Sequence, residues 1–125
     1  MKYFFLLFLF LTSFLFGQED MANMREYYFV ELLRIPDRPV LDSSTSAKIQ
    51  SAHLNNIDSL HQAGKLVLAG PFGDDKGGGI LILKAESLEE ATNMCDSDPA
   101  IKNGRLNYTV RPWWSDKTMF TSEKE

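Results

Sequence analysis

The segment AHLNNIDSLHQAGKLVLAGPF, residues 52–72, decides how the rest of the chain is interpreted. Apolar residues recur at helical spacing up to Gly64, the residue type that most readily adopts the left-handed conformation after a helix. A short run of strand-forming residues follows at 65–69 and ends at a Gly-Pro turn. We therefore expect a helix over about 45–63, capped by one of the hydroxyl residues at 43–45 and leading directly into a strand.

Patterns on either side of this segment predict three further strands and a second helix. Aromatic and β-branched residues predict strands over 26–34, 79–85 and 105–113. The S-x-x-E sequence at 87–90 has the spacing of a capping box, which predicts a helix that ends near residue 95. The order strand, helix, strand, strand, helix, strand (βαββαβ) is the split β-α-β arrangement. It predicts a ferredoxin-like α+β fold, an antiparallel sheet with both helices on one face.

The expected strands are apolar on both faces, although the two helices can cover only one. In the first strand Tyr28, Val30 and Leu32 alternate with Phe29 and Leu33. A large apolar sheet face is rarely left to water. The same face of a second chain is the simplest cover, so we predict a homodimer. The alternative is that the long loop or the C-terminal tail covers this face.

The first residues have the pattern of an export signal. A lysine at the start precedes an apolar run, residues 3–16, which is shorter than the roughly 20 apolar residues that span a bilayer. We predict a signal peptide over 1–17, a linker over 18–25, one domain over 26–114 and a flexible tail over 115–125. Cleavage would leave no stable membrane span and a periplasmic or secreted protein. An uncleaved membrane anchor is the alternative.

Charge and cysteine content exclude several classes of function. The net charge is −4, which argues against nucleic acid and anionic membrane surfaces as partners. Cys95 is the single cysteine, so an intrachain disulfide, a zinc finger and an iron–sulfur cluster are excluded. The acidic residues beside it disfavour a thiolate, so we do not expect Cys95 to be a nucleophile.

His53 raises the question of function because it lies on the apolar face of the expected helix. At about 100° per residue, His53 falls near the centre of the apolar stripe that runs from Ile49 to Leu60, whereas His61 falls at its edge. A polar ring directed into a core needs a hydrogen-bond partner, without which burial costs roughly 1–3 kcal/mol. No acid lies on the same face of this helix. Asp98, which precedes Pro99 and is placed to cap a helical turn, is the candidate partner.

A buried carboxylate beside the imidazole would orient the ring and favour its protonated form. Such a pair suits general acid–base chemistry on a small molecule. The residues alone leave two alternatives open: His53 as a structural histidine with a satisfied hydrogen bond, and Asp98 as a helix cap only.

The glycine-rich segment GPFGDDKGGG, residues 70–79, is interpreted as a hairpin loop. It lacks the order of a phosphate-binding loop and precedes a strand rather than a helix, and its glycines would supply positive φ. Gly70 and Pro71 are expected at the lip of the pocket, with Phe72 as an apolar wall. A metal site formed by the adjacent aspartates of this segment and the two histidines would have no characteristic ligand spacing, so we do not predict a metal. The reaction that we expect needs no other cofactor.

Five pieces of the sequence occur in a distinctive order and spacing: residues 52–72, the glycine-rich turn, ESLEEA, DSDPAIKNGRL and VRPWW. Together they resemble the YciI-like (YCII-related) domain family over roughly residues 27–114. The resemblance implies a ferredoxin-like fold paired as a dimeric α+β barrel. It also implies a pocket in which a histidine and an aspartate, here His53 and Asp98, form the proposed active site. Muconolactone isomerases and chlorohydroxyhydroquinone dehydrochlorinases are similar in fold or belong nearby, and they handle small ring-derived acids or phenols.

The resemblance favours a cofactor-independent lyase or isomerase for a small organic acid or phenol, in which His53 moves a proton and Asp98 orients it. A non-catalytic periplasmic carrier or sensor of small molecules on the same fold is the alternative. A third hypothesis is a structural or regulatory dimer in which His53 and Asp98 have no role in binding or catalysis. The export signal and the long loop from Ile35 to Ser44 depart from the simplest members, so a substrate from a cytoplasmic pathway transfers poorly.

Overall fold

The strands of residues 21–120, which the computed structural model describes, form an antiparallel sheet in the order β2-β3-β1-β4. They are β1 (Met24–Arg34), β2 (Leu66–Pro71), β3 (Gly79–Leu83) and β4 (Leu106–Asp116). β3 pairs antiparallel with β1 on one side and with β2 on the other. The sequence of elements confirms the predicted ferredoxin-like α+β fold.

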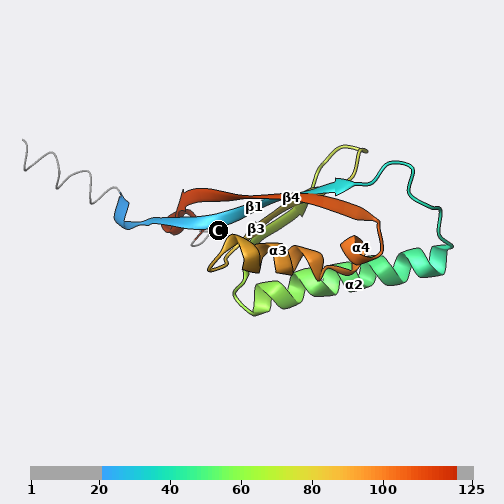
Figure 1. The fold of residues 1–125 in the computed structure, drawn as a ribbon, viewed down its shortest axis with the longest axis horizontal. Coiled ribbons are helices and arrows are strands. Elements are labelled where there is room, and N and C mark those ends of the chain that lie inside the picture. Colours follow the sequence, from blue (N-terminus) through green and yellow to red (C-terminus); the bar gives the residue numbers. More distant parts are fainter. Residues whose placement is uncertain (1–20, 121–125) are drawn as a thin grey trace, which may run out of the picture. The chain divides into compact units, whose positions relative to one another are not determined.

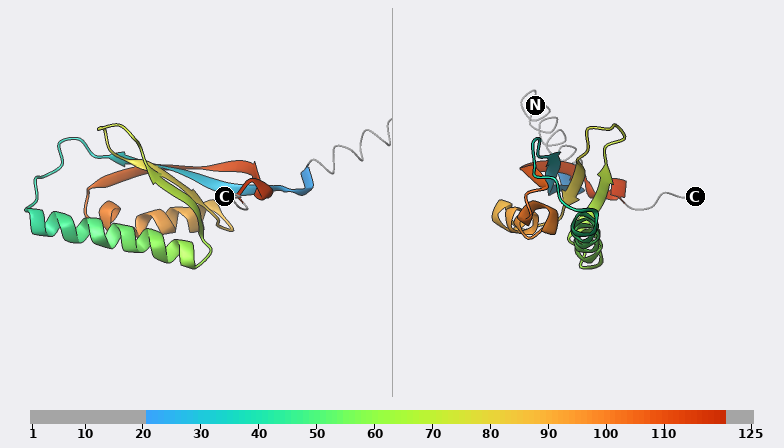
Figure 2. Two further views of the ribbon diagram at one scale, coloured as in Figure 1. Left: turned by 180° about the vertical axis from the view of Figure 1, so that it is seen from behind. Right: turned by 90° about the vertical axis from the view of Figure 1, so that its right-hand side faces the viewer.

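The helices α2, α3 and α4 lie against one face of this sheet (Figures 1 and 2). They span α2 (Ser43–Gln62), α3 (Leu88–Asp96) and the single turn α4 (Pro99–Lys102). Gly64 has a φ of +71°, so the predicted left-handed residue after α2 is confirmed. The chain can therefore reverse at the end of α2 and enter β2 within a few residues.

The first and last strands of the chain, β1 and β4, run beyond the expected domain limits. Residues 26–113 form one compact unit, and the described residues on either side belong to a second. β1 starts two residues before Glu26, inside the expected linker, and β4 ends two residues after Trp114, inside the expected tail. A 3₁₀ helix, η1 (Lys117–Phe120), follows β4. The expected signal peptide and the last five residues of the chain lie outside the described residues.

The N-terminal caps follow the sequence with one correction. Asp42, rather than a hydroxyl residue at 43–45, caps α2, because its carboxylate accepts hydrogen bonds from the backbone nitrogen and the hydroxyl of Thr45 at 2.8 and 2.7 Å. These bonds hold the pKa of Asp42 below its ordinary value. Ser87 caps α3 as predicted, although Glu90 accepts from the backbone nitrogen of Glu86 instead of Ser87.

The core lies between the sheet and the helices. In β1 alternate side chains face the helices, as the period of a strand requires. The core comprises Tyr28, Val30, Leu32, Leu66, Leu81, Leu83, Ala85, Ala91 and Cys95. Val30 and Leu83 are fully buried, and burial of a side chain of this size stabilises the fold by about 1.5–3 kcal/mol.

The opposite face of the sheet carries an apolar row that follows from the strand register. Phe29 pairs with Ile82, and Ile82 pairs with Leu68, so these three side chains lie side by side across β1, β3 and β2. Leu68 is 54% exposed. No helix within residues 26–113 covers this face, since α2, α3 and α4 all lie on the other one.

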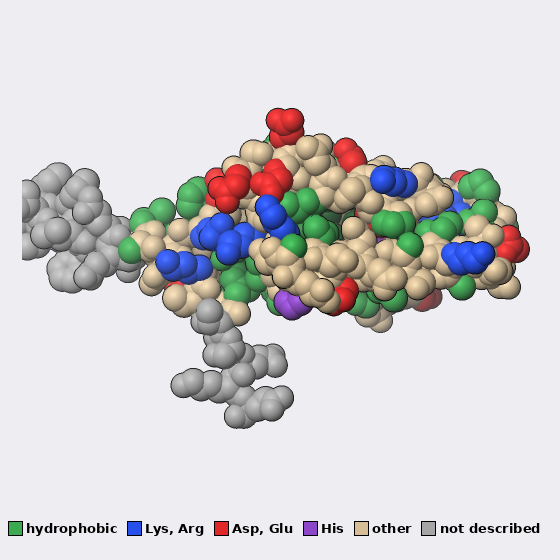
Figure 3. Space-filling view, turned by 90° about the horizontal axis from the view of Figure 1, so that it is seen from below, with side chains coloured by type: hydrophobic (Ala, Val, Ile, Leu, Met, Phe, Trp, Pro, Cys, Tyr) green, Lys and Arg blue, Asp and Glu red, His purple; other side chains and the backbone are tan. Residues whose placement is uncertain are grey.

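The side of the molecule seen in Figure 3 carries basic and acidic side chains close to one another, with hydrophobic side chains between them. It offers no broad surface of one charge to a polyanion. Among residues 21–120, no helix is both long enough and apolar enough to cross a bilayer.

Candidate functional site

His53 lies in the middle of α2 and points into the protein. Its side chain is buried, with 7% of the residue exposed, and it is the buried residue of this 20-residue helix. His61, two turns later, is exposed, and its Nδ1 lies 3.2 Å from the carbonyl oxygen of Leu66. The two histidines of the chain therefore occupy different environments, and His53 alone is enclosed.

Asp98 is the N-cap of α4, as its position before Pro99 predicts. Its Oδ1 accepts a hydrogen bond of 2.8 Å from the backbone nitrogen of Ala100. Proline at the first helical position needs no such bond, because it has no N–H. Only 2% of Asp98 is exposed, so this cap is also a buried carboxylate that requires further partners.

The imidazole of His53 supplies the other partner. Its Nδ1 lies 2.8 Å from Oδ2 and 2.9 Å from Oδ1 of Asp98. An ionised carboxylate only accepts hydrogen bonds, so Nδ1 carries the proton in this pair. Within the described residues Nε2 has no hydrogen-bond partner. It is not among the fully buried polar atoms, because none of those lacks a partner. Nε2 is therefore the ring nitrogen that a ligand can reach, as a proton acceptor in the neutral ring and as a donor in the imidazolium.

His53 lines a cavity of about 440 Å³ between α2 and the hairpin of β2 and β3. The predicted pocket residues Gly70, Pro71 and Phe72 line the same cavity. Asp98 is not part of its wall and holds the ring from behind. Most of the lining is apolar, which suits a small ring compound. The structure thus brings the predicted residues together, and their roles in binding or catalysis stay predictions.

Three residues of α2 that line the cavity were not predicted as pocket residues from the sequence. Gln50, Leu54 and Ile57 line the cavity together with His53. Their spacing of i, i+3, i+4 and i+7 is that of one helix face, so the pattern around His53 contained this information.

The glycine-rich hairpin approaches the rest of the sheet closely. Gly77 and Gly78 have φ of +78° and +83°, which confirms that glycines supply positive φ here. A Cβ on Gly78 would lie 2.2 Å from the carbonyl oxygen of Leu32. The backbone of this hairpin can therefore form the cavity wall only without side chains at such positions.

Groups with alternative chemistry lie elsewhere. Cys95 is in the core, and burial, with the charges of Asp96 and Asp98, raises its pKa to about 12. That value opposes a thiolate, in agreement with the sequence interpretation. Among the described residues no group of three or more His, Cys, Asp or Glu side chains is placed to hold a metal ion.

Comparisons with known proteins give a family and a fold. The family model described as YCII-related domain matches residues 29–114. The chain is 35% identical in sequence to the uncharacterized protein YjpA of Bacillus subtilis (strain 168) over 63 residues. The aligned region covers 50% of this chain and 73% of YjpA. The structure of 5-chloro-2-hydroxyhydroquinone dehydrochlorinase (TftG) from Burkholderia phenoliruptrix AC1100, in complex with 2,5-dihydroxybenzoquinone, matches with a TM-score of 0.54 and 24% identity. The match covers 70% of this chain and 92% of TftG, and it supports the fold.

Proposed function

Because the chain belongs to the YCII-related domain family, we propose that it is a cofactor-independent lyase or isomerase for a small organic acid or phenol. One observation carries the proposal. His53 lines an apolar cavity while its Nδ1 is held by the buried carboxylate of Asp98. This arrangement leaves Nε2 as the group that exchanges a proton with a bound compound.

In the proposed reaction the neutral imidazole accepts a proton at Nε2 from a carbon or hydroxyl group of the substrate. The imidazolium that forms lies against the Asp98 carboxylate, which stabilises its charge and fixes the ring orientation. The same Nε2 then returns the proton to another atom of the substrate or to a leaving group.

The class of substrate is proposed from the cavity and from the structural relative. A cavity of about 440 Å³ accommodates a substituted six-membered ring. TftG is named as a dehydrochlorinase of a chlorinated hydroxyhydroquinone, and its structure holds 2,5-dihydroxybenzoquinone. Phenols, hydroxyquinones and ring-derived acids are therefore the first compounds to screen.

The test is a turnover screen with this compound class on the native protein and on His53→Asn. Loss of general acid–base catalysis lowers rates by about 10²- to 10⁴-fold, and we expect a loss in this range. His61→Asn is the matched control, because His61 is exposed and is not part of the cavity wall. Turnover that is the same in His53→Asn and the native protein would contradict the proposal.

A non-catalytic binding role is favoured by one separate observation. His53 is the only titratable side chain among the described residues that line the cavity. An enzyme that needs a second acid or base would have to obtain it from the substrate, whereas a carrier or sensor needs none. Tight binding of a compound that is recovered unchanged after long incubation would favour this role over the enzyme.

Export and dimerisation are further parts of the proposal. The apolar run of residues 3–16 supports removal of residues 1–17 on export to the periplasm or medium. Intact mass of the protein isolated from a secreting host would reveal cleavage, and a full-length mass would contradict it. The apolar row of Phe29, Ile82 and Leu68 supports a homodimer through the sheet face that lacks helices.

A further inference from the structure

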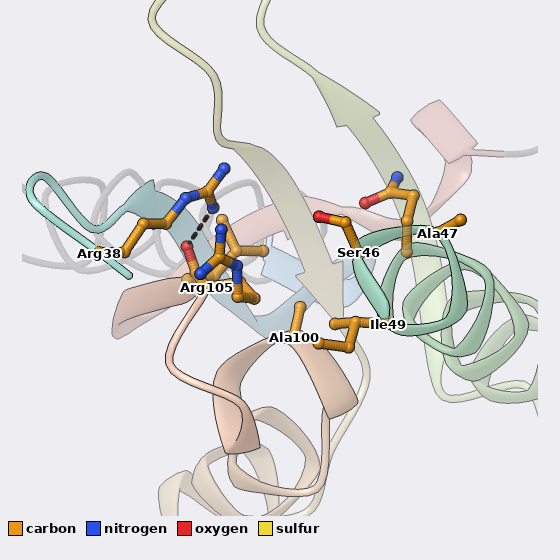
Figure 4. Close-up of a pocket in the computed structure, with 8 residues that line it drawn as sticks. Arg38, Ser46, Ala47, Ile49, Ala100 and Arg105 are labelled. Carbon is orange, nitrogen blue, oxygen red and sulfur yellow. Dashed lines mark hydrogen bonds between the residues drawn. The ribbon is translucent and has the colours of Figure 1, made fainter. Parts of the chain in front are cut away.

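A second cavity lies beside the one at His53, and two arginines form part of its wall. It has a volume of about 380 Å³. Figure 4 shows Arg38 and Arg105 on one side of it and Ser46 and Ile49 of α2 on the other. Arg38 comes from the loop before α2, and Arg105 directly precedes β4. Segments far apart in the sequence therefore place two guanidinium groups at one cavity.

Two hydrogen bonds, one donated by each guanidinium to a backbone carbonyl of the opposite segment, hold these arginines in place. Nη1 of Arg38 donates to the carbonyl oxygen of Arg105, and Nη1 of Arg105 donates to the carbonyl oxygen of Pro39, each at 2.7 Å. A guanidinium carries five N–H groups. Each arginine is thus fixed by one donor and keeps others for a ligand. A purely structural role for the pair would be to pin the loop to the start of β4.

The charges of these arginines are not neutralised by the protein around them. Within residues 21–120, neither guanidinium has a carboxylate oxygen within 4 Å. Both residues are half-buried, and partial burial together with the charges of Arg105 and Arg34 lowers the pKa of Arg38. Like charges held near each other repel more strongly where water is partly excluded. A bound anion would relieve this repulsion, and guanidinium groups are well suited to carboxylates.

The arginine cavity and the His53 cavity adjoin along α2. Gln50 and Leu106 line both of them. Gln50 precedes His53 by three residues, or about 4.5 Å along the helix axis, and Ser46 precedes it by seven, or about 10 Å. The axial rise between His53 and the α2 residues that line the arginine cavity is therefore of the same order as the length of a small ring compound with a charged substituent.

We infer that Arg38 and Arg105 form an anion subsite that binds a carboxylate or ionised hydroxyl of the substrate while its ring lies against His53. The inference rests on the proposed function, because it assigns the substrate class of the same site. It narrows that class to small ring compounds that are anionic at neutral pH. Neither arginine exchanges a proton in this scheme, since their role is to bind and orient.

The test compares an acid with its uncharged counterpart. Protein purified from cells that express the full chain is titrated calorimetrically with 4-hydroxybenzoate and with 4-hydroxybenzamide. We expect the acid to bind at least tenfold more tightly. Arg38→Gln and Arg105→Gln should each weaken binding of the acid about tenfold and leave binding of the amide unchanged. Arg111→Gln is the matched control, because Arg111 is exposed on β4 and lines neither cavity.

Lysine variants distinguish the effect of the positive charge from the effect of the arginine on loop structure. Other outcomes distinguish failure of the anion subsite from failure of the proposed function. Arg38→Lys and Arg105→Lys keep the charge and should retain part of the preference for the acid, with melting temperatures that confirm folding. Equal affinity for acid and amide, both weakened in His53→Asn, would overturn the anion subsite and leave the proposed function standing. A preference for the acid that survives both glutamine variants, or the absence of binding by either compound, would also overturn it. The turnover screen tests the proposed function independently.

Discussion

At the scale of single residues, the carboxylate of Asp98 has two structural roles. It caps α4 through Ala100 and holds Nδ1 of His53. A cap alone would tolerate exposure, whereas this carboxylate is almost fully buried and satisfied on both sides. The pair is therefore sensitive to the loss of either partner, because the remaining group would be buried without a hydrogen bond.

Replacement of Asp98 provides a graded test of this pair. We expect Asp98→Ala to lower the free energy of unfolding by about 2–4 kcal/mol, from the lost cap and the unpartnered imidazole, measured by urea denaturation. Asp98→Asn should cost less, because an amide oxygen can still accept from one of the two donors. ¹⁵N NMR of the imidazole would show which ring nitrogen carries the proton. An Asp98→Ala variant as stable as the native protein, with an unchanged ring tautomer, would contradict the assigned geometry.

Cys95 is predicted to be unreactive in the folded protein. It is 2% exposed, and burial raises its pKa to about 12, so the thiolate is scarce at pH 8 and the sulfur is out of reach of a reagent. An aromatic disulfide reagent at pH 8 should release no chromophore from the native chain over minutes. In 6 M guanidinium, as the control, it should release one equivalent, because the chain has one cysteine. Rapid release of one equivalent without denaturant would show that Cys95 is accessible.

At the scale of secondary-structure elements, the β2–β3 hairpin and the α2–β2 connection depend on glycine for different reasons. Gly78 combines positive φ with a backbone oxygen 2.2 Å from the position of a Cβ, whereas Gly64 has positive φ and open space. We expect Gly64→Ala to cost about 1–2 kcal/mol of unfolding free energy from strain alone, and Gly78→Ala to cost more. Gly73→Ala, with no neighbour and no positive φ, should change stability by less than about 0.5 kcal/mol.

Thermal and urea unfolding of these three variants would rank them. Gly78→Ala should also weaken binding of ring compounds, because the residue lines the cavity. A Gly78→Ala variant no less stable than Gly64→Ala would mean that the hairpin can shift away from β1 without cost.

The elements themselves were largely predictable because their signals are local. Gly64 after α2, Ser87 before α3 and Pro99 in α4 each determine the conformation of their own neighbours, and the structure has the expected elements at each. The ends of β1 and β4 were not predictable in this way. Where a strand stops depends on how far its partner continues, which is not encoded in the residues of that strand alone.

The site was predictable only in part for the same physical reason. His53 was found because a polar ring interrupts an apolar stripe, and Asp98 because a cap precedes a proline. The pairing of Arg38 with Arg105 joins residues 67 positions apart. No periodicity connects such distant positions, so the second cavity could be identified only in the structure and not from the sequence.

At the scale of the whole molecule, the sheet face without helices is the feature that packing within residues 26–113 does not explain. The row of Phe29, Ile82 and Leu68 runs across three strands, and Leu68 is more than half exposed. Ile82 is already buried within the chain, so pairing two copies through this face would remove mainly Leu68 and the exposed part of Phe29 from water in both chains at once. A charge placed within the row should then act on association rather than on folding.

Leu68→Glu tests this directly, because a carboxylate from each copy would be buried in the proposed contact. We expect the native protein to have the mass of a dimer by light scattering coupled to gel filtration, and Leu68→Glu to have that of a monomer with near-native circular dichroism. Val40→Glu is the matched control, since Val40 is 97% exposed in the loop before α2 and should leave the dimer intact. A native protein that is monomeric at high micromolar concentration would refute the dimer. A Leu68→Glu variant that stays dimeric would assign the dimer contact to another surface.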